Sequence, residues 1–279
     1  MSASMAGFVL NDTAIKLVAD TLGLYQTIFI RGVFAVLFVG LFAWWRGAFE
    51  TLPTRDDMRR ISWRTLSEIG ATLAFLTALF HMPLANITAI LQVLPLSIAL
   101  AAAIFMGEPI GRKRIFAILI GFVGVMIIIR PGTSDFNAYA LLGLVAVACV
   151  TVRDLSVRRI SPKVSSLFVA FWASAAIMLT GGAGVLITGD WQPMSTRDLS
   201  LLALAAVFIF IGYYCSVAAM RVGEVAVVTP YRYSVMIWAI ILGWLVFGDI
   251  PDGWTILGMA VILATGLFTM WREHQLRKA

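Results

Sequence analysis

The chain has 279 residues, of which 61% are hydrophobic and 13% are charged, and its mean hydropathy is +0.93. Soluble domains are about half apolar and about a quarter charged, so this composition excludes a water-soluble domain and predicts an all-helical polytopic membrane protein. The net charge of +6 does not indicate nucleic-acid binding, because the basic residues lie between apolar stretches rather than in one patch.

Ten apolar stretches are predicted to be membrane-spanning helices, since each is long enough to cross hydrocarbon at about 1.5 Å per residue. The first is the most polar, because it contains Asn11, Asp12 and Lys16. Only a few residues precede this span, which is consistent with a natural chain that starts upstream of Met1. Residues 53–64 are predicted to be a solvated connector, and no cleaved signal peptide is expected. The predicted spans lie near residues 3–20, 24–45, 66–83, 86–106, 114–130, 138–155, 164–188, 199–220, 224–247 and 253–271.

The distribution of Lys and Arg predicts the orientation in the membrane. With the N-terminus inside, the inner loops and the C-terminal tail hold fifteen basic residues, and the outer loops hold only Arg130 and Arg197. This asymmetry predicts a multi-pass protein of the bacterial inner (plasma) membrane with both termini in the cytoplasm. Cys149 and Cys215 lie inside apolar stretches without metal-type spacing, so neither a metal nor a cofactor is expected.

The fourth and ninth predicted spans are related by an internal repeat. A shift of 141 residues places Ala85 on Ala226, Thr88 on Thr229, Gln92 on Tyr233 and Gly107 on Gly248. We therefore divide the chain into two repeats of five spans each, residues 1–132 and 138–271. Because five is odd, the repeats have opposite orientations, which is the inverted-repeat plan of secondary transporters with a substrate site between the halves.

These motifs resemble a known family. The segments PLANITAILQVLPLSIALAAAIFMGEPIGRKR and VGEVAVVTPYRYSVMIWAIILGWLVFGDIP are similar to the ten-span EamA-type branch of the drug/metabolite transporter superfamily. The opening segments LNDTAIKL and LYQTIFIRG are similar to those of alphaproteobacterial members, which include carriers described as riboflavin transporters. The resemblance implies two inverted five-helix repeats that carry a small molecule across the membrane.

Polar residues within the first two spans are candidates for substrate binding, because an ionisable group at the bilayer centre is costly unless it is paired or hydrated. Asp12 and Lys16 are spaced to form an intrahelical pair, so a structural role and a binding role both remain open for them, with Asn11 beside them as a donor and acceptor. Arg31, with Gln26 above it, could pair with Asp12 or meet an anionic substrate.

The fourth and ninth spans are predicted to supply facing walls of a central cavity. Thr88 and Gln92 share a helical face, and Thr229 and Tyr233 are their counterparts in the ninth span, where Arg232 adds a positive charge one position before Tyr233. An arginine flanked by tyrosines suits a planar or anionic solute, through stacking and paired hydrogen bonds. All five are therefore predicted to bind substrate.

Other residues are predicted to have structural roles. Glu68 and the pair Arg153–Asp154 lie at span ends and are expected at the inner rim. Several aromatic residues lie in mid-span and are options for a cavity lining: Trp172, Tyr213, Tyr214 and Trp238. Four glycines predict close helix contacts, either between the halves or between the protomers of a homodimer: Gly121, Gly124, Gly258 and Gly266.

The leading functional hypothesis is a secondary carrier of a small metabolite that works by alternating access, with a vitamin such as riboflavin as substrate. The alternatives are an exporter of amino acids or drug-like metabolites, a lipid-carrier flippase, and an intramembrane enzyme. Asp12 and Asp154 superficially suggest an intramembrane protease, but HExxH and GxSxG motifs are absent from the sequence. We therefore expect no enzymatic activity, and we expect the partners to be a small-molecule substrate and the bilayer, without nucleic acid.

Overall fold

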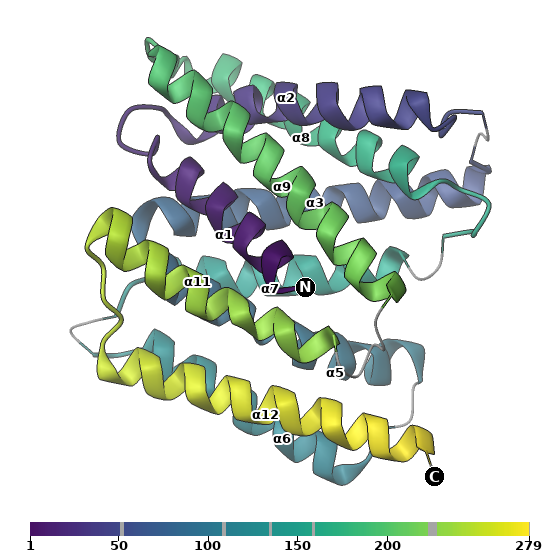
Figure 1. Ribbon diagram of the computed structural model, residues 1–279, viewed down its shortest axis with the longest axis vertical. Helices are drawn as coiled ribbons and strands as arrows, with labels where there is room; N and C mark the ends of the chain where they lie inside the picture. The colour runs from purple at the N-terminus through teal and green to yellow at the C-terminus, as the bar shows by residue number, and fades with distance from the viewer. Residues whose placement is uncertain (51–52, 108–109, 134–135, 158–159, 223–227, 279) are drawn as a thin grey trace.

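The computed structural model describes residues 1–50, 53–107, 110–133, 136–157, 160–222 and 228–278, and within these ranges the chain is helical without any β-strand (Figure 1). This confirms the predicted all-α polytopic class. The helices are α1 (Ser2–Lys16), α2 (Leu24–Trp45), α3 (Arg55–His81), α4 (Leu84–Leu91), α5 (Leu94–Met106), α6 (Arg112–Ile129), α7 (Tyr139–Val157), α8 (Ser166–Thr188), α9 (Thr196–Val222), the 3₁₀ segment η1 (Thr229–Tyr233), α11 (Ser234–Leu242), the π-helical segment η2 (Gly243–Phe247) and α12 (Gly253–Lys278).

Within the described ranges, seven helical segments are long and apolar enough to cross a membrane. They correspond to α2, α4 with α5, α7, α8, α9, the segment from η1 to η2, and α12. The other three predicted spans correspond to α1, which has only 15 residues, α3, whose first half is charged, and α6, which begins with three basic residues. The multi-pass architecture is therefore clear, and the count of ten crossings stays a prediction.

The prediction of a connector at residues 53–64 is wrong, because α3 begins at Arg55 and the rest of this segment forms its first turns. Thr54 caps the helix, and its side-chain oxygen accepts a hydrogen bond from the backbone N–H of Asp57 at 3.2 Å. Asp56 and Asp57 lie in the first turn, where negative charge favours the helix dipole. These local signals extend the helix well before its apolar part begins.

Asp57 also ties two loops together. Its Oδ1 accepts the backbone N–H of Ser161 at 3.0 Å, and its Oδ2 accepts the hydroxyl of Thr54 at 2.8 Å. These hydrogen bonds, chiefly the one from Ser161, hold the pKa of the Asp57 carboxyl below its ordinary value. A carboxylate with a lowered pKa stabilises the fold above its unfolded pKa, and this contribution is lost as the pH falls through the folded pKa.

We therefore expect Asp57→Asn to lower the melting temperature of the detergent-solubilised protein at pH 7. The difference from wild type should shrink below about pH 4, where the wild-type carboxylate also becomes protonated. Asp56→Asn is the matched control, because Asp56 lies in the same helical turn but is exposed. Equal melting temperatures for the two variants at pH 7 would contradict the role given to Asp57.

Two predicted spans are interrupted. The span expected at residues 86–106 breaks at Gln92 and Val93 into α4 and α5, with Pro95 in the first turn of α5. Proline has no N–H to donate to the carbonyl four residues earlier, so the ladder of helical hydrogen bonds is broken there. The ninth predicted span is also irregular, since its described part passes from η1 through α11 to η2. Residues 223–227, which include Glu224, lie outside the described residues, as do Glu108, Arg158 and Arg159.

The helices pack in pairs. The most extensive contacts join α2 with α8, α3 with α7, α6 with α12, and α1 with α9, and Figure 1 shows α2 beside α8 at the top and α6 beside α12 at the bottom. Glycines allow the backbones to approach closely at these crossings. Gly124 of α6 meets Gly258 of α12, so the predicted glycine contact is found within one chain.

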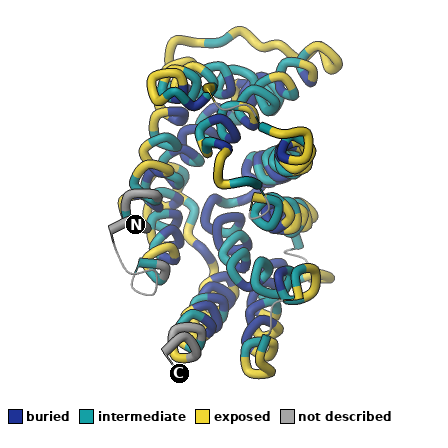
Figure 2. The backbone as a smooth tube through the Cα atoms, turned by 90° about the vertical axis from the view of Figure 1, so that its right-hand side faces the viewer, coloured by how far each residue is buried: buried dark blue, intermediate teal, exposed yellow. Residues whose placement is uncertain are grey.

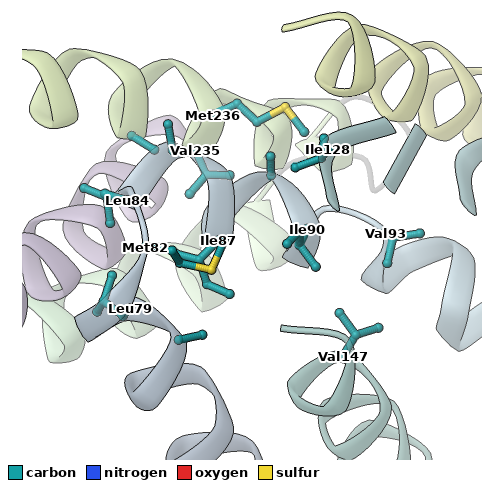
Figure 3. Close-up of a cluster of buried hydrophobic side chains, with 14 of the residues drawn as sticks. Leu79, Met82, Leu84, Ile87, Ile90, Val93, Ile128, Val147, Val235 and Met236 are labelled. Atoms are coloured by element: carbon teal, nitrogen blue, oxygen red, sulfur yellow. The ribbon is translucent and has the colours of Figure 1, made fainter. Parts of the chain in front are cut away.

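The main core lies where the interrupted helices meet. Figure 3 shows Ile87 and Ile90 of α4 beside Val147 of α7 and Met236 of α11, with the other labelled side chains turned toward the same space. Ile87 and Ile90 are fully buried. Figure 2 shows that buried residues lie where the helices face one another and that exposed residues lie on their outer sides and in the loops. Large exposed apolar residues such as Leu41 and Leu186 suit contact with lipid.

Candidate functional site

The crossing of α1 and α9 creates the site, because small residues bring the two backbones together. A Cβ at Gly7 would lie 3.0 Å from the carbonyl oxygen of Phe208 and 3.2 Å from Gly212. The hydroxyl of Ser4 donates to the carbonyl of Gly212 at 2.6 Å. At this crossing the aromatic residue that follows Gly212, Tyr213, meets Phe8 of α1.

Asn11 connects the two ionisable residues of this region. Its Nδ2 donates to Oδ1 of Asp12 at 2.8 Å, and its Oδ1 accepts from Nη1 of Arg31 at 3.4 Å. Asn11 is only 3% exposed, whereas Asp12 and Arg31 are half-buried. Asp12 and Arg31 also interact electrostatically. The predicted contact between Asp12 and Arg31 is therefore relayed through an amide rather than made as a direct ion pair.

We call Asn11, Asp12 and Arg31 the central polar cluster, because their hydrogen bonds join α1 to α2. Tyr213 of α9 lies beside α1 one helical turn before Asp12, where its ring packs edge-on against Phe8 with centroids 5.2 Å apart, and it is 53% exposed. The cluster thus joins α1 with α2, and the ring contact joins α1 with α9.

A second group, the α3–α7 ion-pair network, consists of Arg64, Glu68, Arg153 and Asp154. Nη1 of Arg153 lies 3.0 Å from Oε1 of Glu68, and Nε of Arg153 donates to Oδ1 of Asp154 at 2.8 Å. Arg64 approaches the other oxygen of Glu68 at 3.2 Å. Glu68 also interacts electrostatically with Arg31. The network links helices from both halves of the chain, so its members do more than face a solvated rim.

The guanidinium of Arg31 has the most unused hydrogen-bonding capacity in the cluster. Its Nε is buried and lacks a hydrogen-bond partner within the described residues. An arginine offers five N–H donors in a planar fork, and the contact to Asn11 is long. Because unpaired donors are costly in a low-dielectric interior, this geometry favours a ligand that supplies acceptor oxygens.

Lys16 and Gln26 do not belong to the cluster. Nζ of Lys16 donates to the carbonyl of Met82 at 2.7 Å and lies 3.7 Å from Oδ2 of Asp249, while the described residues show no ion pair with Asp12. The amide of Gln26 makes two reciprocal bonds of 2.9 Å with the backbone of Gln192. Both predicted binding residues are therefore occupied by tertiary contacts at one end of the bundle.

The Lys16 contacts join α1 to the turns before α4 and α12, so they should restrict access from this end. We expect Lys16→Met to increase the labelling rate of a cysteine introduced at Thr88, which is buried in α4. The rate would be measured with a membrane-impermeant maleimide after both native cysteines are replaced by alanine. Lys113→Met is the matched control, because Lys113 is exposed on α6. Equal labelling rates in the two variants would contradict the restriction.

The facing walls predicted from the fourth and ninth spans are only partly formed. Thr88 is buried, and Gln92 donates to the carbonyl of Thr88 at 3.4 Å, within its own helical segment. Arg232 is exposed, but Tyr233 is only 4% exposed and packs against Gly266 of α12. In a 3₁₀ helix successive side chains point about 120° apart, which agrees with one exposed and one buried residue, so the wall formed by both of them stays a prediction.

Two other outcomes concern the sequence predictions. The side chain of Thr229 lies outside the described part of the structure. Glu68 and Arg153 form an ion pair between α3 and α7 although they were not predicted as binding residues. Their signal was present, because both are charged positions near apolar stretches. Sequence position alone does not show toward which neighbour they point.

Comparisons with known proteins identify similar chains along the whole length. The model of the EamA-like transporter family matches residues 1–130 and 137–271. The riboflavin transporter of Vibrio cholerae serotype O1 is 26% identical over 286 residues, which cover 100% of this chain and 94% of that protein. The pseudopaline exporter CntI of Pseudomonas aeruginosa is 25% identical over 262 residues and 92% of this chain, covering 89% of the exporter.

Two further comparisons extend this result. The S-adenosylmethionine uptake transporter of Rickettsia felis is 23% identical over 266 residues, which cover 95% of this chain and 89% of that protein. A solved crystal structure aligns with a TM-score of 0.62 at 18% identity, covering 99% of this chain and 98% of the other. This similarity shows a shared fold.

Proposed function

The chain belongs to the EamA-like transporter family, and from this premise we propose that it carries a small metabolite across the bacterial inner membrane by alternating access. The family and its place in the drug/metabolite transporter superfamily agree with the resemblance found in the sequence. The chain is a multi-pass small-metabolite transporter, which points away from an enzyme. Its substrate, direction and site belong to the proposal.

The central polar cluster is the main observation that supports the proposed site. It joins Asp12 and Arg31, two ionisable residues of α1 and α2, through hydrogen bonds to Asn11. Ionisable groups inside membrane helices are costly and usually mark a substrate or ion pathway. The cluster also lies between helices of the two halves, where inverted-repeat carriers bind their substrates.

Riboflavin is the leading candidate substrate. The riboflavin transporters of Vibrio cholerae and Rhizobium johnstonii are each 26% identical to this chain. The ring carbonyl oxygens of a flavin also suit the donors of Arg31 that the described residues leave unused. Export of another metabolite is the second candidate, and the 25% identity to the pseudopaline exporter supports it.

The proposed mechanism uses two inverted repeats, residues 1–132 and 138–271. Helix pairing supports this division, because exchanging the halves turns the α1·α9 pair into α7·α3 and leaves α2·α8 and α6·α12 unchanged. The loop charges support cytoplasmic termini. In this orientation the Lys16 contacts lie on the outer side, so the structure corresponds to a state that is more restricted on that side.

Uptake into proteoliposomes tests the proposed function. The purified protein would be offered riboflavin, S-adenosylmethionine, lysine and a nucleoside, each radiolabelled. We expect saturable riboflavin uptake above that of protein-free liposomes, without lysine uptake. Uptake of lysine alone would favour the amino-acid exporter alternative, and lack of uptake of any compound would contradict the proposed carrier.

A further inference from the structure

We propose that the ion pair between Glu68 and Arg153 is a gate between the two halves of the carrier, placed toward the end of the bundle opposite to the Lys16 contacts. This inference rests on the proposed transport function and names a contact that breaks when the inner side opens. Arg64 and Asp154 are the partners that keep each half neutral after the pair has separated. The gate therefore belongs to the α3–α7 ion-pair network and is distinct from the central polar cluster.

The position of the network along the bundle is the first support. His81 at the end of α3 stacks on Tyr139 at the start of α7, with ring centroids 4.0 Å apart, so these two helix ends lie at one level. Counted along their helices, Glu68 and Arg153 each lie about 20 Å from that level. Asn11 lies only about 8 Å from the end of α1, which is bonded to the turn that follows α3. A solute that leaves the central polar cluster for the inner side therefore passes the level of the proposed gate.

The second support is the way in which the charges are divided between the halves. Nη1 of Arg153 lies 3.0 Å from Oε1 of Glu68, and this contact joins the first half to the second. The other two ion pairs each lie within one helix, Arg64 with Glu68 at 3.2 Å on α3 and Arg153 with Asp154 at 2.8 Å on α7. Separation of α3 from α7 would thus leave one neutral pair in each half. A charge left without a partner in the membrane is costly, and this arrangement avoids that cost.

Arg64 also has unused hydrogen-bonding capacity that suits the separated state. Its Nη2 contacts Oε2 of Glu68, whereas its Nε and Nη1 are buried without a hydrogen-bond partner within the described residues. A guanidinium can bind both oxygens of a carboxylate through two parallel N–H groups. When Arg153 releases Oε1, Glu68 can therefore turn both oxygens toward Arg64. The hydrogen bond lost between the halves is then replaced within α3.

Burial distinguishes this pair from the ion pairs at the opposite end of the bundle. The side chains of Glu68 and Arg153 are 15% and 21% exposed. The carboxylates that form ion pairs at the other end, Asp249 and Asp252, are 36% and 45% exposed. Water can hydrate an exposed carboxylate when its partner leaves, so such pairs are weak. A buried pair separates at low cost only where each charge keeps another partner, as both members of this pair do.

Double electron–electron resonance on the detergent-solubilised protein tests the gate. Spin labels would be attached to cysteines introduced at Ser62 of α3 and Val157 of α7, which are both exposed, after the two native cysteines are replaced by alanine. Wild type should show mainly the shorter distance between the labels. We expect Glu68→Gln to raise the ratio of longer to shorter distances about tenfold, because a neutral acceptor replaces a charged one in the contact between the halves. Arg153→Gln should have the same effect.

Two further variants distinguish a gate from a network that only stabilises the fold. Arg64→Gln and Asp154→Asn leave the contact between Glu68 and Arg153 in place but remove the partner that one half needs after separation. We expect neither variant to raise the distance ratio above that of wild type, and we expect both to slow uptake into proteoliposomes at least about tenfold. Arg59→Gln is the matched control, because Arg59 is exposed on α3 outside the network, and it should match wild type in both measurements. Gel filtration would confirm that each variant is folded.

The outcomes separate the gate from the proposed function. An unchanged distance ratio in Glu68→Gln would overturn the gate, and so would a ratio in Arg64→Gln and Asp154→Asn that rises as far as in Glu68→Gln. Either result, together with riboflavin uptake by the wild type, would leave the carrier intact. Absence of uptake of every compound in the panel would instead reject the carrier, whereas the distance ratios would still test the contact between α3 and α7.

Discussion

Substitution of Asp12 by leucine is expected to abolish transport and to destabilise the protein by about 1–3 kcal/mol, the cost of a buried polar group left without its partner. The variant removes the carboxyl group near Arg31 and leaves Asn11 without the acceptor that its Nδ2 uses. The loss of an acidic neighbour is also unfavourable for an arginine inside a membrane helix bundle. Asp12→Asn should be less destabilising, because an amide can still accept the hydrogen bond.

A double substitution separates the two consequences. Asp12→Leu combined with Arg31→Met removes both charges, so we expect melting temperature and membrane insertion to recover while transport stays absent. Thermal melting of the detergent-solubilised protein and uptake into proteoliposomes would be measured on the same preparations. If the double variant were as unstable as Asp12→Leu alone, the charge balance would not be the cause.

Substitution of Gly258 by leucine is expected to prevent stable packing of α6 against α12. A Cβ at Gly258 would lie 2.6 Å from the carbonyl oxygen of Gly124 and 2.5 Å from Cγ1 of Ile128. The first contact is with backbone, so the helices must separate to make room. Overpacking of this kind costs about 1–3 kcal/mol even for small insertions, so Gly258→Ala should already lower the melting temperature.

Gly253 provides the matched control on the same helix. A Cβ at Gly253 meets no atom within 4 Å, so Gly253→Ala and Gly253→Leu should melt near wild type. Fluorescence-detected gel filtration after heating would compare the four variants. A Gly258→Leu protein that is as stable as Gly253→Leu would contradict the close crossing of α6 and α12.

The sequence predicted the helical class and many helix positions well. The apolar stretch expected at residues 24–45 matches α2, and Gly124 and Gly258 were predicted to support a close crossing that the structure confirms. These features are local, because hydropathy and small residues act over one or two helical turns. The same contact lies within one chain, so the homodimer considered from the glycines stays a prediction.

The break at Gln92 and Val93 was harder to predict from the sequence. Pro95 was visible, but a proline is compatible with the first turn of a helix as well as with a kink. Only the packing of α4 against α7 and α11 shows that the chain stops one helix and starts another. Hydropathy treats the whole stretch as one apolar run.

The site was predicted in part, because hydropathy identifies polar residues in a span but not the direction of their side chains. Asn11, Asp12 and Arg31 do come together, whereas Lys16 is bound by residues far along the chain, Met82 and Asp249. Such partners depend on tertiary packing, and a spacing of four residues cannot exclude them.

Arg232 is a second residue whose side-chain direction could not be predicted from its position in the sequence. Its depth along the ninth span predicted a cavity position, but local 3₁₀ geometry leaves it exposed while Tyr233 turns into the core. The arginine that joins the polar residues of α1 is instead Arg31, which donates to Asn11.

Solute counterflow tests the central claim most directly. Proteoliposomes would be loaded with unlabelled riboflavin and diluted into labelled riboflavin, and the initial rate of label entry would be compared with that of unloaded vesicles. A carrier that alternates between two sides is accelerated by substrate on the opposite side, so we predict a transient accumulation of label above the external concentration. Entry of label without this acceleration would contradict alternating access through the central polar cluster.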